Sequence, residues 1–184
     1  VIDASAREDL DARVAVVISN KSGAFGLERA RRAGIPAVHL DIADYRDRDA
    51  YNHAIRETLE EHKVGLVVMA GYMRLLGTEV LEAFPGAVIN LHPALLPSFP
   101  GASAIRDAFE YGVKVTGVTV HFADEVFDRG PIICQEAVRI EEDDTLATLE
   151  AKIHEVEHRL LPEAIGLIAA GRVRLDGRIV RIVT

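Results

Sequence analysis

A chain of 184 residues is long enough for one domain with a sizeable core, and we expect residues 1–184 to form a single domain. Hydrophobic residues make up 49% of the chain and charged residues 27%, the balance of a soluble globular protein rather than a disordered or membrane-embedded one. The 21 basic residues are scattered and outnumbered by 29 acidic ones, for a net charge of −8, which disfavours nucleic acid as a partner.

The cysteine and apolar content point to the cytoplasm. Cys134 is the single cysteine, so no disulfide can form within the chain, which is typical of a reducing compartment. It lies in the apolar run 131–134, and we expect a buried, unreactive thiol. No apolar stretch reaches about 18 residues, and Val1–Ser5 is not a signal peptide, so we expect a cytoplasmic protein without a membrane partner.

In the first half of the chain, short apolar runs alternate with longer amphipathic stretches. The pattern predicts strands over 14–18, 37–40 and 64–70, and helices over 24–33, 47–62 and 77–83. The run at 64–70 is continuously apolar, as in a strand that is covered on both faces. Such alternation is typical of an α/β protein with a doubly wound, mostly parallel sheet flanked by helices.

In the second half, the expected strands follow one another more closely. The pattern predicts strands over 88–92, 115–122 and 132–139, helices over 103–111 and 145–170, and a terminal hairpin over 173–183. Asp144 is the candidate N-cap of the long helix. We therefore expect mixed strand pairing in this half of the α/β fold.

Asn90 and His92 stand two residues apart at the end of the strand expected over 88–92. Alternate residues of a strand share a face and lie about 6.7 Å apart along it, so the two side chains point the same way. Ligands bind at the carboxyl ends of strands in open α/β sheets. A carboxamide and an imidazole there can hold a developing oxyanion and move a proton, but a turn cap and a hydrogen-bonded strand end explain the pair equally well.

The loop at 93–101 contains three prolines, which restrict the backbone and fix the positions of neighbouring side chains. Its apolar residues lie beside a polar strand end, which fits either a wall of the site or a loop that covers core. The sequence leaves the isomer of the bond before Pro97 open.

Asp128 lies in the turn-forming segment 127–131, after a strand that carries Thr119 and His121 on one face. An aspartate near His92 would favour the imidazolium, which suits general acid catalysis worth about 10²- to 10⁴-fold in rate. The two residues are 36 positions apart, so the sequence alone does not show that they meet. A turn aspartate taken by itself is more often structural.

Arg74 follows the strand expected at 64–70 and can bind a carboxylate. The apolar residues Met73, Leu75 and Leu76 around it can line a slot for a flat ring. In isolation, a solvated arginine beside core residues explains the same segment.

His154 and His158 have the i, i+4 spacing of metal ligands on the long helix. No third ligand stands nearby, and the catalytic glutamate of a zinc protease motif is missing. We therefore expect no metal site.

Taken together, three parts of the sequence resemble the signature motifs of the folate-dependent formyltransferases, and among them of the glycinamide ribonucleotide formyltransferase family. These parts are Asn90–Gly101, Gly117–Phe122 with Asp128–Pro131 beyond it, and Ala70–Leu76. The resemblance covers nearly the whole chain from about Val14 onward. It implies a Rossmann-like formyltransferase fold and an enzyme of de novo purine biosynthesis that takes its formyl group from 10-formyltetrahydrofolate.

The resemblance also implies a role for each matching residue. Asn90 and His92 would polarise the formyl carbonyl and stabilise the tetrahedral intermediate, and Asp128 would pair with His92 and assist proton movement. The folate would be bound by Arg48, Met73, Arg74, Leu75, Leu76, Asn90, Asp124, Glu125, Val126 and Phe127. Substrate binding would fall to Thr119, His154 and Glu157. The implied partners are the folate and glycinamide ribonucleotide, for a monomer or homodimer, and no metal is needed because the formyl donor is already activated.

Two features depart from the pattern of the family. The family begins with a strand and a glycine-rich phosphate loop, whereas Val1 corresponds to a point inside the helix that follows, so the expected domain lacks both. Ser103 stands where many members have histidine, and we assign it no catalytic role.

Three other functions share some of these sequence features with glycinamide ribonucleotide formyltransferases. A formyltetrahydrofolate hydrolase (deformylase) uses water as the acceptor and resembles this chain in its core, but it carries an extra N-terminal regulatory domain without a counterpart here. Methionyl-tRNA formylation is disfavoured, because the extra C-terminal domain and a basic face for tRNA are missing. A non-catalytic nucleotide-binding module would explain the helix and strand pattern but not Asn90, His92 and Asp128 together. Whether these three side chains meet around one pocket separates an enzyme from such a module.

Overall fold

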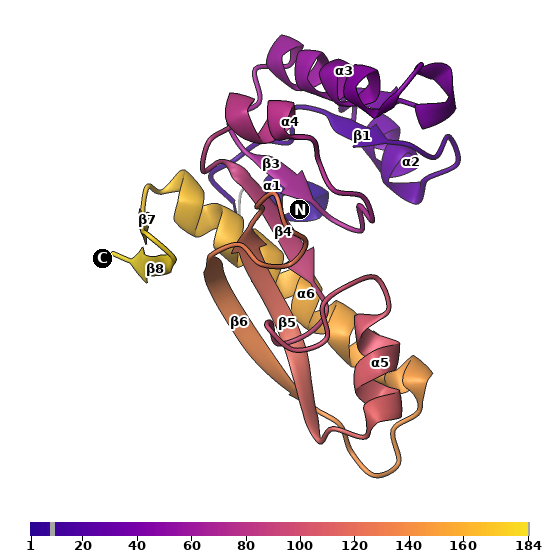
Figure 1. Cartoon of the computed structure of the whole chain (residues 1–184), viewed down its shortest axis with the longest axis vertical. Coiled ribbons are helices and arrows are strands. Elements are labelled where there is room, and N and C mark those ends of the chain that lie inside the picture. Colours follow the sequence, from indigo (N-terminus) through magenta and orange to yellow (C-terminus); the bar gives the residue numbers. More distant parts are fainter. Residues whose placement is uncertain (8–9, 184) are drawn as a thin grey trace. The chain divides into compact units, whose positions relative to one another are not determined.

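The chain folds into two units that differ in how their strands pair (Figure 1). The computed structural model describes residues 1–7 and 10–183. Unit 1 comprises Val1–Val67 and Leu76–Ala87, and unit 2 comprises Val68–Leu75 and Val88–Thr184. Within the described residues, no helix is both long and apolar enough to cross a membrane.

Unit 1 is built on a parallel pair of strands. Its elements are, in chain order, α1 (Ile2–Ala6), β1 (Val17–Ser19), α2 (Phe25–Arg32), β2 (Ala37–His39), the 3-10 helix η1 (Ile42–Asp44), α3 (Arg48–Glu61) and α4 (Thr78–Ala83). Val17 of β1 lies opposite Ala37 of β2, and the connecting helix α2 packs against both strands. The predicted alternation of strands and helices is confirmed here, since a parallel pair needs such a crossover.

Polar side chains fix the starts of α3 and α4 in unit 1. The side chain of Asp47 accepts a hydrogen bond from the Ala50 amide at 2.8 Å and caps α3. Asn52 of α3 is buried, and its Oδ1 accepts from the Gly77 amide at 2.9 Å. That bond fixes the start of α4, because Gly77 is the N-cap residue of this helix.

Unit 2 carries an antiparallel sheet with a long helix against it (Figure 1). Its elements are β4 (Val88–His92), α5 (Ala104–Tyr111), β5 (Val115–Phe122), β6 (Ile132–Arg139), α6 (Leu146–Ala169), β7 (Val173–Asp176) and β8 (Ile179–Ile182). The sheet order is β3-β4-β5-β6, where β3 spans Val67–Met69. β5 pairs antiparallel with both β4 and β6, and β7 and β8 form an antiparallel terminal hairpin. This half thus adds antiparallel strands to a fold whose first half has the parallel pair β1–β2, which gives the chain the expected mixture of pairings.

β5 is covered on both faces. α6 packs against β5 and β6, and the loop at 93–101 reaches β5 at Gly117, where an added Cβ would stand 2.7 Å from the side chain of Leu95. Every residue from Thr116 to Phe122 is buried for this reason. The polar side chains of β5 are therefore cut off from water and need partners within the protein.

Two strand boundaries were predicted wrongly. β1 begins at Val17 rather than at position 14, and β3 covers only Val67–Met69 of the stretch predicted at 64–70. Apolar residues mark where a chain is buried, whereas a strand extends only as far as its neighbour offers backbone partners, as Val17 finds in Ala37.

The start of α6 was also predicted one residue too early. Thr145 is the N-cap, since its side chain accepts from the Thr148 amide at 3.2 Å in a capping box. Asp144 instead accepts a hydrogen bond from Lys152 Nζ at 2.6 Å, which holds the pKa of its carboxyl at about 2. The bond between Leu96 and Pro97, left open by the sequence, is cis.

Candidate active site

The candidate site begins with a pair of opposed strands in unit 2. On β4, Asn90 and His92 share a face, and the register places Asn90 opposite His121 and His92 opposite Thr119 of β5. Residues directly opposite each other in an antiparallel pair lie on the same face of the sheet. Four polar side chains are therefore gathered on one face, where the loop at 93–101 covers β5.

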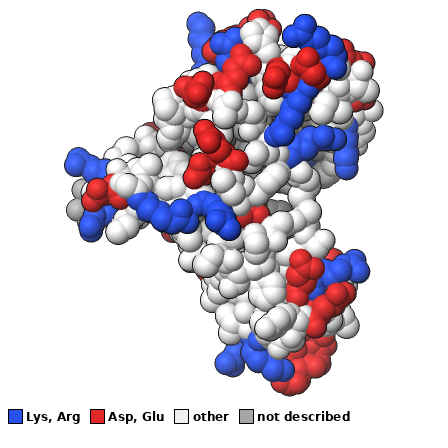
Figure 2. Space-filling view, viewed as in Figure 1, with Lys and Arg blue, Asp and Glu red and all other residues white. Residues whose placement is uncertain are grey.

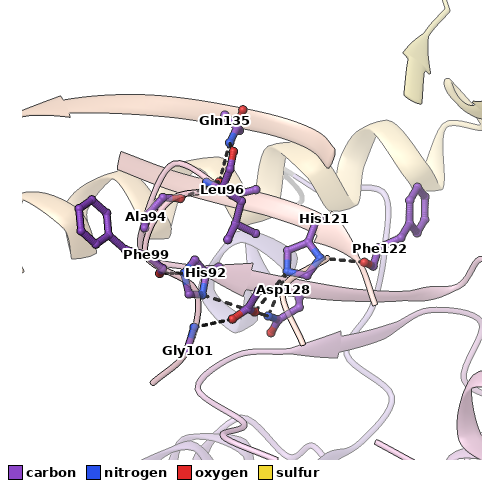
Figure 3. Close-up of polar contacts among 11 residues, drawn as sticks. His92, Ala94, Leu96, Phe99, Gly101, His121, Phe122, Asp128 and Gln135 are labelled. Carbon is purple, nitrogen blue, oxygen red and sulfur yellow. Dashed lines mark hydrogen bonds and ion pairs between the residues drawn. The ribbon is translucent and has the colours of Figure 1, made fainter. Parts of the chain in front are cut away.

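His92 is buried and held from both sides of its ring (Figure 3). Its Nε2 lies 2.8 Å from the carbonyl oxygen of Phe99, which can only accept, so Nε2 carries a hydrogen. Its Nδ1 lies 3.5 Å from Oδ1 of Asp128. Nδ1 is therefore the ring nitrogen that faces the carboxylate.

Asp128 is the centre of the site, and its side chain is 6% exposed. One oxygen, Oδ2, accepts a hydrogen bond from the Gly101 amide at 2.8 Å. The other, Oδ1, faces His92, lies 3.4 Å from Nδ2 of Asn90 and lies 3.8 Å from Nε2 of His121. Figure 3 shows both imidazole rings directed at this carboxylate. The meeting of Asn90, His92 and Asp128, which the sequence could not show, is thus observed.

His121 belongs to the site although we did not predict a role for it. Its Nδ1 donates to the Phe122 carbonyl at 2.7 Å, and its Nε2 lies 3.2 Å from Nδ2 of Asn90. Burial lowers the pKa of His121, so the ring is neutral and Nε2 accepts. The alternation of β5 put His121 beside Thr119, but the missing information was the strand register that sets it opposite Asn90.

A tight turn presents Asp128 to the site. Asp128 has φ of +54°, a left-handed conformation that aspartate tolerates better than most residues. Gly130 follows it, and a Cβ there would stand 1.7 Å from the Phe122 carbonyl oxygen. The turn closes this tightly because the Phe122 amide donates to the Pro131 carbonyl at 2.9 Å. The backbone of the segment leaves room only for glycine at position 130.

The residues expected to bind folate fall into both units. Met73, Arg74 and Leu75 lie in unit 2, as does the segment Asp124–Phe127, whereas Arg48 and Leu76 lie in unit 1. Met73 is 66% exposed and Phe127 is 50% exposed, so both apolar side chains are accessible to a ligand. Leu76 is buried.

The residues expected to bind the substrate differ in exposure. His154 and Glu157 lie on α6, and Nδ1 of His154 is 2.7 Å from Oε2 of Glu157. His154 is exposed, whereas Thr119 is 0% exposed.

Neither a metal-binding cluster nor a reactive thiol is found among the residues that the structure describes. Among residues 1–7 and 10–183, no three His, Cys, Asp or Glu side chains are grouped so that they could hold a metal ion. Burial raises the pKa of the Cys134 thiol to about 11, so the thiol is protonated at neutral pH.

The chain thus combines an α/β fold with an asparagine, a histidine and an aspartate that converge at one strand end. The sequence pattern of the formyl transferase family matches residues 1–165, and the chain belongs to this family. The phosphoribosylglycinamide formyltransferase of Bacillus subtilis is 46% identical over 158 residues, which cover 86% of this chain and 81% of that protein. The crystal structure of glycinamide ribonucleotide transformylase 1 from Symbiobacterium toebii has a TM-score of 0.97 at 50% identity, over 100% of this chain and 86% of that one. The predicted formyltransferase fold is therefore confirmed.

A second activity occurs on the same fold. The structure of a formyltetrahydrofolate deformylase from Pseudomonas syringae has a TM-score of 0.90 at 28% identity, over 99% of this chain and 60% of that one. The fold therefore does not by itself separate transfer to an amine from transfer to water.

Proposed function

We propose that this chain transfers a formyl group from 10-formyltetrahydrofolate to the amine of glycinamide ribonucleotide, a step of purine biosynthesis. The observation that carries the proposal is that Oδ1 of Asp128 lies 3.4 Å from Asn90 and 3.5 Å from His92, at a strand end of a formyl transferase fold. The family pattern runs through both units, which supports one catalytic domain.

Formyl transfer moves one group and one proton. The substrate nitrogen bonds to the formyl carbon, the bond from that carbon to the folate nitrogen breaks, and one proton passes from the attacking amine to the leaving nitrogen. Negative charge develops on the formyl oxygen at the tetrahedral stage. A site for this reaction needs donors for that oxygen and a group that takes and returns a proton.

Asn90 is suited to the developing oxyanion. One hydrogen of its Nδ2 is directed to Nε2 of His121 at 3.2 Å, and the contact with Asp128 at 3.4 Å is long for a hydrogen bond. The hydrogen that points toward Asp128 can therefore be donated to a substrate oxygen instead, because only a weak contact is lost. One preorganised donor of this kind contributes about 10²- to 10³-fold in rate.

His92 is suited to move the proton. The bond from Nε2 to the Phe99 carbonyl holds the ring, so proton exchange is confined to Nδ1 beside Asp128. Asp128 places a carboxylate oxygen beside Nδ1, and its second oxygen is anchored by the Gly101 amide. The pair thus resembles an acid–base couple whose orientation is fixed by two backbone groups.

The binding residues follow from the same proposal. The exposed apolar side chains of Met73, Val126 and Phe127 suit the flat ring of the folate, since they are accessible and can pack against an apolar ring. Further folate contacts are Arg48, Arg74, Leu75, Leu76, Asp124 and Glu125. His154 and Glu157 are the contacts proposed for the ribose and phosphate of the substrate.

The proposal is tested by supplying the purified chain with 10-formyltetrahydrofolate in the presence and absence of glycinamide ribonucleotide. We expect tetrahydrofolate and the formylated amide to appear together, and only when the amine is present. Equal release of tetrahydrofolate and formate without the amine would make the chain a hydrolase, the activity of the deformylase that shares its fold. No consumption of the folate in either mixture would favour a binding module instead.

A further inference from the structure

The site depends on two backbone groups of the loop at 93–101. The Phe99 carbonyl accepts from Nε2 of His92 at 2.8 Å, and the Gly101 amide donates to Oδ2 of Asp128 at 2.8 Å. Phe99 has φ of +51°, a left-handed conformation that is disfavoured for a residue with a Cβ. The surrounding structure must therefore hold the loop in place for these two groups to reach His92 and Asp128.

A row of three side chains crosses the sheet toward this loop. His92 of β4 lies opposite Thr119 of β5, and Thr119 lies opposite Gln135 of β6. Thr119 and Gln135 form hydrogen bonds with the loop as well as with each other. Figure 3 shows Gln135 directed at the segment of the loop that contains Leu96.

The hydroxyl of Thr119 is fully used within the protein. It donates to the Ala94 carbonyl at 2.6 Å, and it accepts from the Leu96 amide at 3.2 Å and from Nε2 of Gln135 at 2.9 Å. A hydroxyl has one hydrogen and two lone pairs, so no capacity remains for a ligand. Thr119 is also 0% exposed, so it cannot contact a substrate directly.

Gln135 completes the same arrangement from the outer strand. Its Nε2 donates one hydrogen to the Leu96 carbonyl at 2.9 Å and the other to Thr119. The remainder of Gln135 is exposed to solvent. Gln135 thus donates one hydrogen bond to the loop directly and a second to Thr119, which itself binds the loop.

We propose that Gln135, acting through Thr119, is a positioning residue for formyl transfer, because it clamps residues 94–96 and so sets the Phe99 carbonyl and the Gly101 amide against His92 and Asp128. This inference rests on the proposed function, and it replaces the substrate-binding role that the resemblance gave to Thr119. In this arrangement β6, the strand that carries Gln135, orients the site residues although none of them lies on β6.

The test removes the clamp at its exposed end. Gln135→Met keeps the length of the side chain but donates no hydrogen bond, and Arg139→Met is the matched control on the same exposed face of β6. We expect kcat of Gln135→Met to fall about 10- to 100-fold with KM changed less than about twofold, since small misplacements of catalytic groups cost rate on this scale. The pH profile of kcat should shift as well, because Asp128 loses its fixed donor. Arg139→Met should match the unmodified chain in both.

A second pair of variants tests Thr119 directly. Thr119→Ser keeps the hydroxyl and should restore most of the kcat that Thr119→Val loses. If Thr119 bound the substrate instead, the loss in Thr119→Val would appear in KM.

A spectroscopic readout separates this inference from the proposed function. In ¹⁵N-labelled protein, the Nε2–H hydrogen bond of His92 should be seen in the unmodified chain and be lost or weakened in Gln135→Met, whatever reaction is catalysed. An unchanged His92 signal together with unchanged kcat would overturn the clamp, as would a loss of kcat matched by an equal loss of thermal stability with His92 unchanged. Failure of the unmodified chain to transfer formyl groups would overturn the proposed function alone.

Discussion

Asn90 of β4 lies directly opposite His121 of β5, and the 3.2 Å contact between Nδ2 of Asn90 and Nε2 of His121 fixes the orientation of the carboxamide. His121 has no freedom to turn, because its Nδ1 hydrogen is committed to the Phe122 carbonyl at 2.7 Å. The other neighbour of Nδ2 is the Asp128 carboxylate, also an acceptor. The amide nitrogen of Asn90 is thus directed into the site by chemistry and not only by packing.

The buried His121 should make stability depend on pH. Burial lowers its pKa below the ordinary value of 6.5, so the unfolded chain binds this proton more readily than the folded chain does. The stabilisation is present above pH 6.5 and is lost as the pH falls from there toward the folded-state pKa. Melting temperatures between pH 8 and pH 5 should therefore fall less in His121→Gln than in the unmodified chain. The exposed His39, changed to glutamine, is the control, and an equal effect in both variants would rule out His121 as the cause.

Removing either half of the acid–base pair should abolish most of the activity without unfolding the chain. His92→Ala removes the proton carrier, and Asp128→Asn removes the charge that faces Nδ1 of His92. We expect kcat for formyl transfer to fall about 10²- to 10⁴-fold in each variant. Circular dichroism should show the helix content of the unmodified chain. The exposed Asp143, changed to asparagine, makes the same chemical change outside the site, and near-normal turnover in the site variants would contradict the assigned roles.

The thiol of Cys134 should react slowly in the folded chain. A pKa of about 11, against an ordinary value of 9.0, lowers the thiolate fraction about a hundredfold at pH 8. Alkylation by iodoacetamide, followed by mass spectrometry, should therefore be at least about a hundredfold slower in buffer than in urea. Equal rates would mean that the thiol is not shielded as its burial indicates.

The sequence predicted what depends on spacing along one strand or helix. The i, i+2 relation set Asn90 and His92 on one face, and β4 has the bounds that the apolar pattern predicts. Helix ends were predicted to within a residue where a short polar side chain precedes them, as Asp47 does for α3. These features are local, so the residues that cause them are neighbours in the sequence.

What the sequence could not predict depends on register and on backbone groups. His121 and Gln135 join the site only because β5 pairs with β4 and β6 in one register, and a shift of one residue would turn both away. The Phe99 carbonyl and the Gly101 amide leave no mark in the sequence, since any residue carries them. The two groups that hold His92 and Asp128 directly, the Phe99 carbonyl and the Gly101 amide, could therefore not be predicted from the sequence.

The turn at Gly130 gives the sharpest test of how the backbone presents Asp128. In Gly130→Ala the new Cβ would meet the Phe122 carbonyl oxygen at 1.7 Å, and a backbone atom cannot yield as a flexible side chain does. The turn must open, which should cost about 1–3 kcal/mol or more in the free energy of unfolding. It should also move Asp128 away from Asn90 and His92. Gly65→Ala is the control, because nothing lies within 4 Å of its added Cβ. Urea unfolding measures the first effect, and kcat at a temperature where both variants are folded measures the second. If Gly130→Ala kept full activity, the closeness of the turn would not be what sets Asp128 in place.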